Sequence, residues 1–383
     1  MLAGELEDIE RIVFEEARDR TLAYLREVLP SFVWRMPVLQ RKRLVEATRI
    51  EPVVVLERAA AERASHHWDF VLVITDAELR THGAPQVLGM PSTALAAAIL
   101  STARLEPALR REDQHAAAPD QLTRRIEALA LHLLGHLVGL GHSDEESDAM
   151  ARVVSATDLD RMHGFSEEEL RYLACELQEV ADLRLEEEPG ALRHPVAFYF
   201  EAAWRNRDEI GRSVRQIAPW RFPLRFGRLT LAAASTLIVL VITAESWDLG
   251  MSQHGGFVAS FATVALAAST AFVLQRHRLL LQPPARLTEL TVVANVSMAL
   301  AVLVGMAATW LLLFLVVLAA SQLFFDEELV RAWATTLDGP LDLERYVVFA
   351  AFVATFGIII GALGASFEPG GYFRHVAYID EET

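Results

Sequence analysis

Polar and apolar residues divide this chain into two halves. Charged residues are frequent from Met1 to about Arg228, whereas the remainder contains long uncharged stretches. A helix needs about 20 apolar residues to cross the hydrocarbon core of a bilayer. The second half therefore predicts four membrane-spanning helices, at about 229–247, 256–274, 293–318 and 346–366.

The first half has the periodicities of a mixed domain. Apolar residues recur at helical spacing over 2–29 and 122–138. Runs rich in β-branched residues predict buried strands at 50–56 and 70–74, and 99–103 is a third candidate. Ser166 and Glu169 form a capping box, which predicts a helix to about Glu187. The predicted fold class is thus an α+β soluble domain followed by an all-α membrane domain of about four transmembrane helices.

Between these halves we expect a connector, so that the predicted domains are 1–165, 166–227 and 228–383. Residues 196–217 combine aromatic and arginine side chains just before the first span. This composition is typical of an amphipathic helix in the membrane interface. A helix packed on the soluble domain is the alternative.

The charged flanks of the spans predict their orientation. Cytoplasmic loops are rich in Lys and Arg. Basic residues precede the first predicted span and lie between the second and third, namely Arg221, Arg225, Arg228, Arg276, Arg278 and Arg286. We therefore expect the soluble half and both termini in the cytoplasm, at a bacterial or archaeal inner (plasma) membrane. The single cysteine, Cys175, and the absence of a secretory signal pattern at the start agree with this expectation.

Charge also narrows the possible partners. The net charge of −16 argues against nucleic acid, which needs a basic face, whereas the apolar half predicts a lipid bilayer as partner. The last three predicted spans contain no Asp, Glu, Lys, Arg or His, which favours an anchor over an ion pathway. Gly357 and Gly361, followed by Ala365, form a ridge of small residues. Such a ridge serves packing within one chain or a homo-oligomer, and the sequence leaves both open.

The chemistry of the first half centres on three histidines. His132 and His136 are four residues apart, so on a helix they lie on the same face, one turn from each other. Gly139 allows the backbone to turn back, which brings His142 to the same place. Three imidazoles with an open fourth position are typical of a catalytic zinc site. We therefore predict His132, His136 and His142 as zinc ligands.

This motif resembles the signature of the metzincin metallopeptidases, H-E-x-x-H-x-x-G-x-x-H followed by a Met-turn. Met150 stands where matrixin-type metzincins have the methionine of that turn. The segments 73–79, 87–92 and 99–105 are similar in order and spacing to the archaemetzincins. Over about residues 50–165, the resemblance implies a metzincin-like soluble domain with bound zinc and a peptide or protein ligand in the metzincin cleft.

The sequence departs from the family pattern at the position of the catalytic glutamate, which is Leu133 here. In zinc peptidases this carboxylate activates water and passes a proton to the leaving amine. The cysteines of a second archaemetzincin zinc site are also absent, since Ser143 follows the third histidine. No catalytic residue can therefore be assigned. The acids considered as substitutes for the base are Glu127, Asp144, Glu145, Glu146 and Asp148, while Asp76 and Glu78 more often belong to a turn.

The residues leave three hypotheses open. The first is a membrane-anchored zinc-binding pseudo-peptidase that acts as a sensor, scaffold or binding module. The second is an active zinc-dependent hydrolase that uses another base or needs none. The third is a membrane assembly protein with a vestigial metal site.

Overall fold

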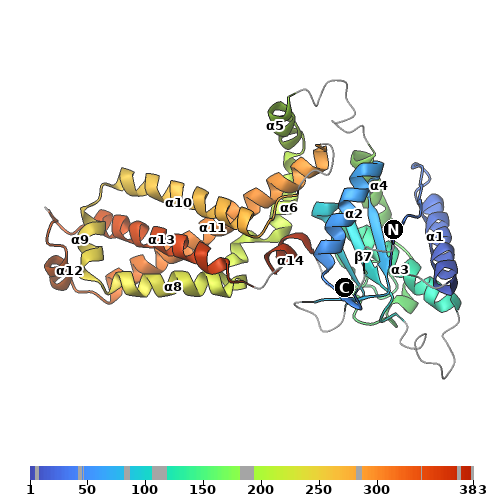
Figure 1. Ribbon diagram of the computed structural model, residues 1–383, viewed down its shortest axis with the longest axis horizontal. Helices are drawn as coiled ribbons and strands as arrows, with labels where there is room; N and C mark the ends of the chain where they lie inside the picture. Colours follow the sequence, from blue (N-terminus) through green and yellow to red (C-terminus); the bar gives the residue numbers. More distant parts are fainter. Residues whose placement is uncertain are drawn as a thin grey trace. The chain divides into compact units, whose positions relative to one another are not determined.

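The computed structural model describes residues 1–4, 8–41, 45, 47–81, 87–105, 119–181, 194–281, 287–337, 339–368 and 372–380 (Figure 1). It contains two compact units. The first comprises Met1–Arg205, Gln282–Val293 and Arg374–Thr383, and the second comprises Asn206–Leu281 and Ala294–Phe373. Arg374–Thr383 therefore belong to the first unit.

A mostly parallel sheet forms the centre of the first unit. Its order is β2-β1-β4-β7-β6, and only β6 runs antiparallel to its neighbour, β7. These strands are β1 (Leu2–Ala3), β2 (Gln40–Arg41), β4 (Val71–Thr75), β6 (Gly89–Ser92) and β7 (Ala97–Ser101). A second, two-stranded sheet pairs β3 (Arg49–Ile50) with β5 (Glu78–Leu79). The antiparallel strand β6 forms one edge of the main sheet.

Helices cover both faces of this sheet (Figure 1). The helices of this unit are α1 (Asp8–Val28), α2 (Pro52–His66), α3 (Pro119–Val138), α4 (Glu167–Val180) and α5 (Pro195–Arg205), with short 3-10 turns η2 (Thr93–Leu95) and η3 (Leu159–Arg161). Helices α1 and α3 lie on one face of the sheet, and α2 lies on the other. Ala98 and Leu100 of β7 share a core with α1 and α3. Because successive side chains of a strand point to opposite faces, Ala97 and Ile99 point to the other face, where α2 packs on β4 and β7.

Most predicted elements of this unit are present, but one prediction is wrong. Strands β4 and β7 and helix α3 lie within two or three residues of their expected bounds. The expected strand at 50–56 is mainly helix α2. Pro52 favours a helix because it occupies the first helical turn, and the buried residues Val53 and Leu56 follow at helical spacing. The expected helix at 2–29 begins only at Asp8, after β1. The capping box of α4 is confirmed, and the helix ends at Val180.

Long apolar helices dominate the second unit. Its helices are α6 (Arg207–Ile217), α7 (Phe222–Arg225), α8 (Gly227–Val241), α9 (Ala244–Ser252), α10 (Gly255–Arg276), α11 (Glu289–Leu323), α12 (Glu327–Trp333) and α13 (Leu343–Ala365), with η6 (Pro219–Arg221), and α11 begins within the first unit. In the described residues, α10, α11 and α13 are each long and apolar enough to cross a membrane. A fourth span exists only if the pair Arg207–Arg225 and Gly227–Val241, bent by 49°, counts as one.

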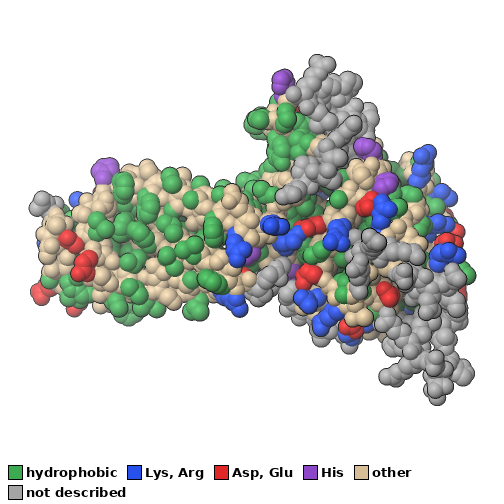
Figure 2. All heavy atoms as spheres, viewed as in Figure 1, with side chains coloured by type: hydrophobic (Ala, Val, Ile, Leu, Met, Phe, Trp, Pro, Cys, Tyr) green, Lys and Arg blue, Asp and Glu red, His purple; other side chains and the backbone are tan. Residues whose placement is uncertain are grey.

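Two predicted segments are interrupted. The first expected span, 229–247, is divided between α8 and α9, and the expected interfacial helix, 196–217, is divided at Asn206 between α5 and α6. Figure 2 shows hydrophobic side chains over the helices of the second unit, whereas charged side chains gather over the first. Exposed apolar side chains of the second unit include Leu231, Ile238, Phe257, Val264, Leu311 and Leu315. This surface suits a lipid environment better than water.

The ridge of small residues on α13 packs within the chain. A side-chain Cβ at Gly357 would lie 2.5 Å from Leu237 of α8, and one at Gly361 would lie 3.1 Å from Ala233. The ridge therefore lets α8 and α13 approach closely. Of the two roles that the sequence left open for it, this is packing within one chain. An association between chains stays a prediction.

Gly364, one turn further along the same interface, gives a test of this packing. Ala at 364 would place its Cβ 2.5 Å from the Cβ of Ala232 and 2.9 Å from the carbonyl oxygen of Arg228. We expect Gly364→Ala to lower the stability of the detergent-solubilised protein by about 1–3 kcal/mol, the usual effect of overpacking. Thermal unfolding measures this, with Gly227→Ala as control because a Cβ there has no neighbour within 4 Å. Equal unfolding temperatures for the two variants would contradict the packing.

Candidate metal centre

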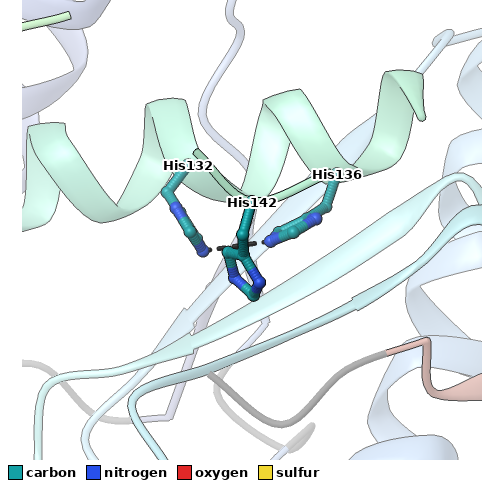
Figure 3. Close-up of side chains that lie close together, drawn as sticks. All are labelled: His132, His136 and His142. Carbon is teal, nitrogen blue, oxygen red and sulfur yellow. Dashed lines mark hydrogen bonds between the residues drawn. The ribbon is translucent and has the colours of Figure 1, made fainter. Parts of the chain in front are cut away.

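Helix α3 and the turn that follows it bring the three histidines together. His132 and His136 project from one face of α3, and His142 returns to them from the turn (Figure 3). Gly139 makes this return possible, because its φ of +101° is a conformation that side chains disfavour. The possible ligand atoms of the three imidazoles all lie within 4.8 Å of one another. The structure thus confirms the proximity that the spacing of the histidines predicted.

Backbone carbonyls orient two of the rings. Nδ1 of His132 lies 2.8 Å from the carbonyl oxygen of Ala149, and Nδ1 of His136 lies 3.1 Å from that of Leu140. Since a carbonyl oxygen only accepts hydrogen bonds, both Nδ1 atoms are assigned the proton and act as donors. In a neutral ring, Nε2 then carries a lone pair that is available to a metal. Such a bond to a carbonyl is the usual second contact of a histidine that binds a metal.

The resulting arrangement fits a cation. The Nε2 atoms of His132 and His136 face each other at 3.0 Å. Burial lowers the pKa of His132 to about 4 and that of His136 to about 3, so both rings are neutral near pH 7. Two lone pairs at this distance repel each other unless a positive charge lies between them. Neutral imidazoles are ligands that zinc prefers, and the cluster of His132, His136 and His142 fits zinc binding.

A tight turn beneath the histidines holds Met150. This side chain is fully buried, and its sulfur lies where a Cβ on Gly135 would come within 2.2 Å. The N–H of Ser143 donates to the carbonyl of Met150 (2.9 Å), and a carboxylate oxygen of Asp148 accepts from the N–H of Met150 (2.8 Å). The turn that contains Met150 also supplies the carbonyl of Ala149, so its fold sets the orientation of His132.

Leu133 is a residue of the core. Its side chain is fully buried among the apolar residues of α1, α3 and β7. A Cβ on Gly89 of β6 would lie 3.0 Å from it, so the leucine packs directly beneath the edge strand. The position at which the family has its glutamate is therefore occupied here by an apolar contact between α3 and β6.

None of the acids considered as substitutes joins the histidine cluster among the residues that the structure describes. Glu145 accepts from the hydroxyl of Ser147, and Glu146 accepts from Arg161. Asp144 is exposed, and Asp148 is engaged with Met150. Burial raises the pKa of Glu127, which lies on α3.

The two acids further upstream lie at the end of β4. Asp76 is in the turn between β4 and β5, and Glu78 of β5 pairs with Arg104 at 3.2 Å. The position of Asp76 agrees with the role in a turn that the sequence favoured, whereas Glu78 belongs to a strand.

Three solved structures resemble part of this chain. Archaemetzincin from Methanopyrus kandleri is 21% identical and covers 46% of this chain and 93% of its own, with a TM-score of 0.36. Archaemetzincin from Archaeoglobus fulgidus, complexed with malonate, is 19% identical over 45% and 96%, with a TM-score of 0.33. A zinc-dependent peptidase from Methanocorpusculum labreanum is 22% identical over 45% and 98%, with a TM-score of 0.35. No family model and no curated protein matches the chain.

No pattern in the sequence marks the groups that support this centre. The carbonyls of Ala149 and Leu140 act through the backbone, so no residue type marks them. Nor did the sequence reveal a contact between the side chains of Glu169 and Asp148. Burial and this contact with a second carboxyl group raise the pKa of Glu169 to about 7. The capping residue of α4 is thereby linked to the turn that carries Met150.

The raised pKa of Glu169 predicts a pH-dependent stability. The pKa of Glu169 in the folded protein exceeds its ordinary value of 4.5. Its contribution to the free energy of unfolding is therefore fully present below about pH 4.5 and is lost as the pH rises through 7. We expect Glu169→Gln, which keeps a hydrogen-bond donor at every pH, to reduce the fall in unfolding temperature between pH 5 and pH 8. The exposed neighbour Glu168 provides the control variant Glu168→Gln. An unchanged fall in Glu169→Gln would show that the two carboxyl groups share no proton.

Proposed function

We propose that this chain is a membrane-anchored, metzincin-like zinc-binding protein with an impaired capacity for peptide hydrolysis, which acts as a sensor, scaffold or binding module. The observation that carries the proposal is the placement of His132 and His136, whose Nε2 lone pairs face one point beside His142. The resemblance of the motif around them to the metzincin signature supports the same conclusion.

The residues at this centre have two roles, which are binding the metal and orienting the imidazole rings. His132, His136 and His142 would hold the zinc, and the carbonyls of Ala149 and Leu140 keep the first two rings in the tautomer that binds metal. Zinc in such a site supplies a Lewis acid that polarises a carbonyl or lowers the pKa of water. The chain must supply any group that moves a proton.

Proton transfer is where this chain differs from a working peptidase. The side chain of Leu133 can neither accept a proton from water nor deliver one to a leaving amine. Loss of a general base lowers the rate about 10²–10⁴-fold. The burial of Leu133 against Gly89 supports a role in packing instead. We therefore propose that the site binds peptides or proteins more readily than it cleaves them.

The apolar helices suggest where the protein works. Helices α10, α11 and α13 are long and apolar enough to cross a bilayer, and many of their large side chains are exposed. We propose that they anchor the chain in the inner (plasma) membrane. The arginines at 221–228 and 276–286 favour a cytoplasmic location for the histidine centre and both termini.

Metal content is the direct test of this proposal. Protein purified in detergent, stripped with a chelator and reloaded is expected to hold one zinc per chain, because three imidazoles converge on one point. Replacing His132, His136 and His142 together by alanine should abolish this content, as measured by elemental analysis. His163→Ala is the matched control, since this exposed histidine lies outside the cluster. Equal zinc in the triple variant and the control would refute the site.

Peptide cleavage tests the proposed impairment. Zinc-loaded protein is expected to cleave peptides no faster than its His136→Ala variant. Leu133→Glu should restore measurable cleavage in the fraction that folds, but it should also lower stability by more than ~2 kcal/mol, because it buries a carboxyl group without a partner. Leu133→Met, which preserves size and polarity, is the control for stability. Robust cleavage by the unmodified protein, lost in His136→Ala, would instead establish an active hydrolase.

A further inference from the structure

The last described residues of the chain carry buried side chains and contact α2 of the first unit. Helix α14 (Tyr372–Tyr378) carries Tyr378, which is fully buried, and His375, which is 6% exposed. Arg374 forms an ion pair with Glu57 of α2. Both partners of this pair are 23% exposed, so the contact is partly shielded from water. These contacts fix the position at which the chain leaves α14.

Immediately after α14, Asp380 binds the edge of the main sheet. Its N–H donates to the carbonyl of Pro91 in β6 (3.2 Å). Its carboxylate accepts from the N–H of Thr93 (2.6 Å) and from the hydroxyl of the same residue. The three bonds engage one backbone group and one side chain of Asp380.

The carbonyl of Pro91 belongs to the outer row of β6. The carbonyl of Leu88 accepts from the N–H of Ser101 in β7 (2.8 Å). In an antiparallel pair, every second residue bonds to the partner strand. Gly89 and Pro91 therefore direct their backbone groups away from β7. These are the groups that an extended peptide would meet, and Pro91, which has no N–H, offers only an acceptor.

The same strand borders the histidine centre. Gly89 packs on Leu133, which adjoins His132 in α3. Since a strand rises about 3.4 Å per residue, Pro91 lies only about 7 Å further along the edge than Gly89. Figure 3 shows a pale red ribbon at its lower right, which belongs to the last part of the chain. A peptide that reached the histidines along this edge would need the position that Asp380 holds.

We propose that the C-terminal tail, the segment from Ile379 onward, is an internal competitor for a peptide-binding site on the edge of β6, in which Thr93 selects an acidic side chain. The proposal rests on the proposed function, since it assigns the ligand class and the regulation of that site. Extended peptides with Asp or Glu opposite Thr93 are the ligands that fit, because the N–H and hydroxyl of Thr93 both donate to one carboxylate. Docking of the tail keeps the site closed to them.

The test measures binding of a fluorescent peptide with the sequence of residues 375–383, His-Val-Ala-Tyr-Ile-Asp-Glu-Glu-Thr, to the full detergent-solubilised protein. A chain that ends after Tyr378 lacks the competitor but keeps the buried anchors of α14. We expect it to bind the peptide at least tenfold more tightly than the intact chain, equivalent to about 1.4 kcal/mol. Asp380→Ala, a single exposed substitution, should shift the affinity in the same direction. Glu15→Ala, an exposed acid on α1, is the control and should leave it unchanged.

Specificity is tested in the shortened chain. Thr93→Val there should lower peptide affinity at least tenfold, and so should replacing the aspartate of the peptide by asparagine. The proposal is overturned if the shortened chain binds no better than the intact one, or if Thr93→Val leaves the affinity unchanged. The bonds of Thr93 involve no histidine, so these differences should persist in zinc-free protein. A failed zinc measurement would therefore leave this test intact, and a failed peptide test would leave the zinc site intact.

Discussion

The candidate centre depends on two hydrogen bonds between imidazoles and backbone carbonyls. The carbonyls of Ala149 and Leu140 fix the protons of His132 and His136 on Nδ1 and so turn both Nε2 lone pairs toward each other. Without these bonds, the rings could exchange tautomers and share a proton. With them, the protein holds two buried acceptors in a repulsive arrangement that a cation relieves. The geometry of the turn that carries Met150 is thus a condition for metal affinity as well as for folding.

Leu133 illustrates how stability and catalysis compete for one position. A carboxylate there could move protons, but it would lie beneath Gly89 and among apolar side chains, where an unpaired charge is expensive. The leucine instead fills the contact between α3 and β6 with an apolar side chain. The edge strand is then held firmly beside the histidines, which suits a surface that binds ligands.

Local patterns in the sequence were informative where local physics decides the structure. The spacing of His132 and His136, the turn at Gly139 and the capping box at Ser166 all operate within a few residues, and all three are present. The segment 50–56 is mainly helical although a strand is expected there, because β-branched residues fit a strand and a buried helix face alike. Pro52 is the better signal, since proline is common in the first turn of a helix. The bond between Thr93 and Asp380 joins residues 287 apart in sequence, and no local pattern could reveal it.

Helix α8 has a consequence for the lipids around the second unit. It contains 15 residues, which span about 22 Å, less than the hydrocarbon thickness of about 30 Å. Helix α11, with 35 residues, spans about 52 Å. If both lie in one bilayer, the short helix requires local thinning or acyl chains of reduced length, whereas the long one tilts or extends beyond the headgroups. Membrane thickness would then act directly on the packing of α8 against α13.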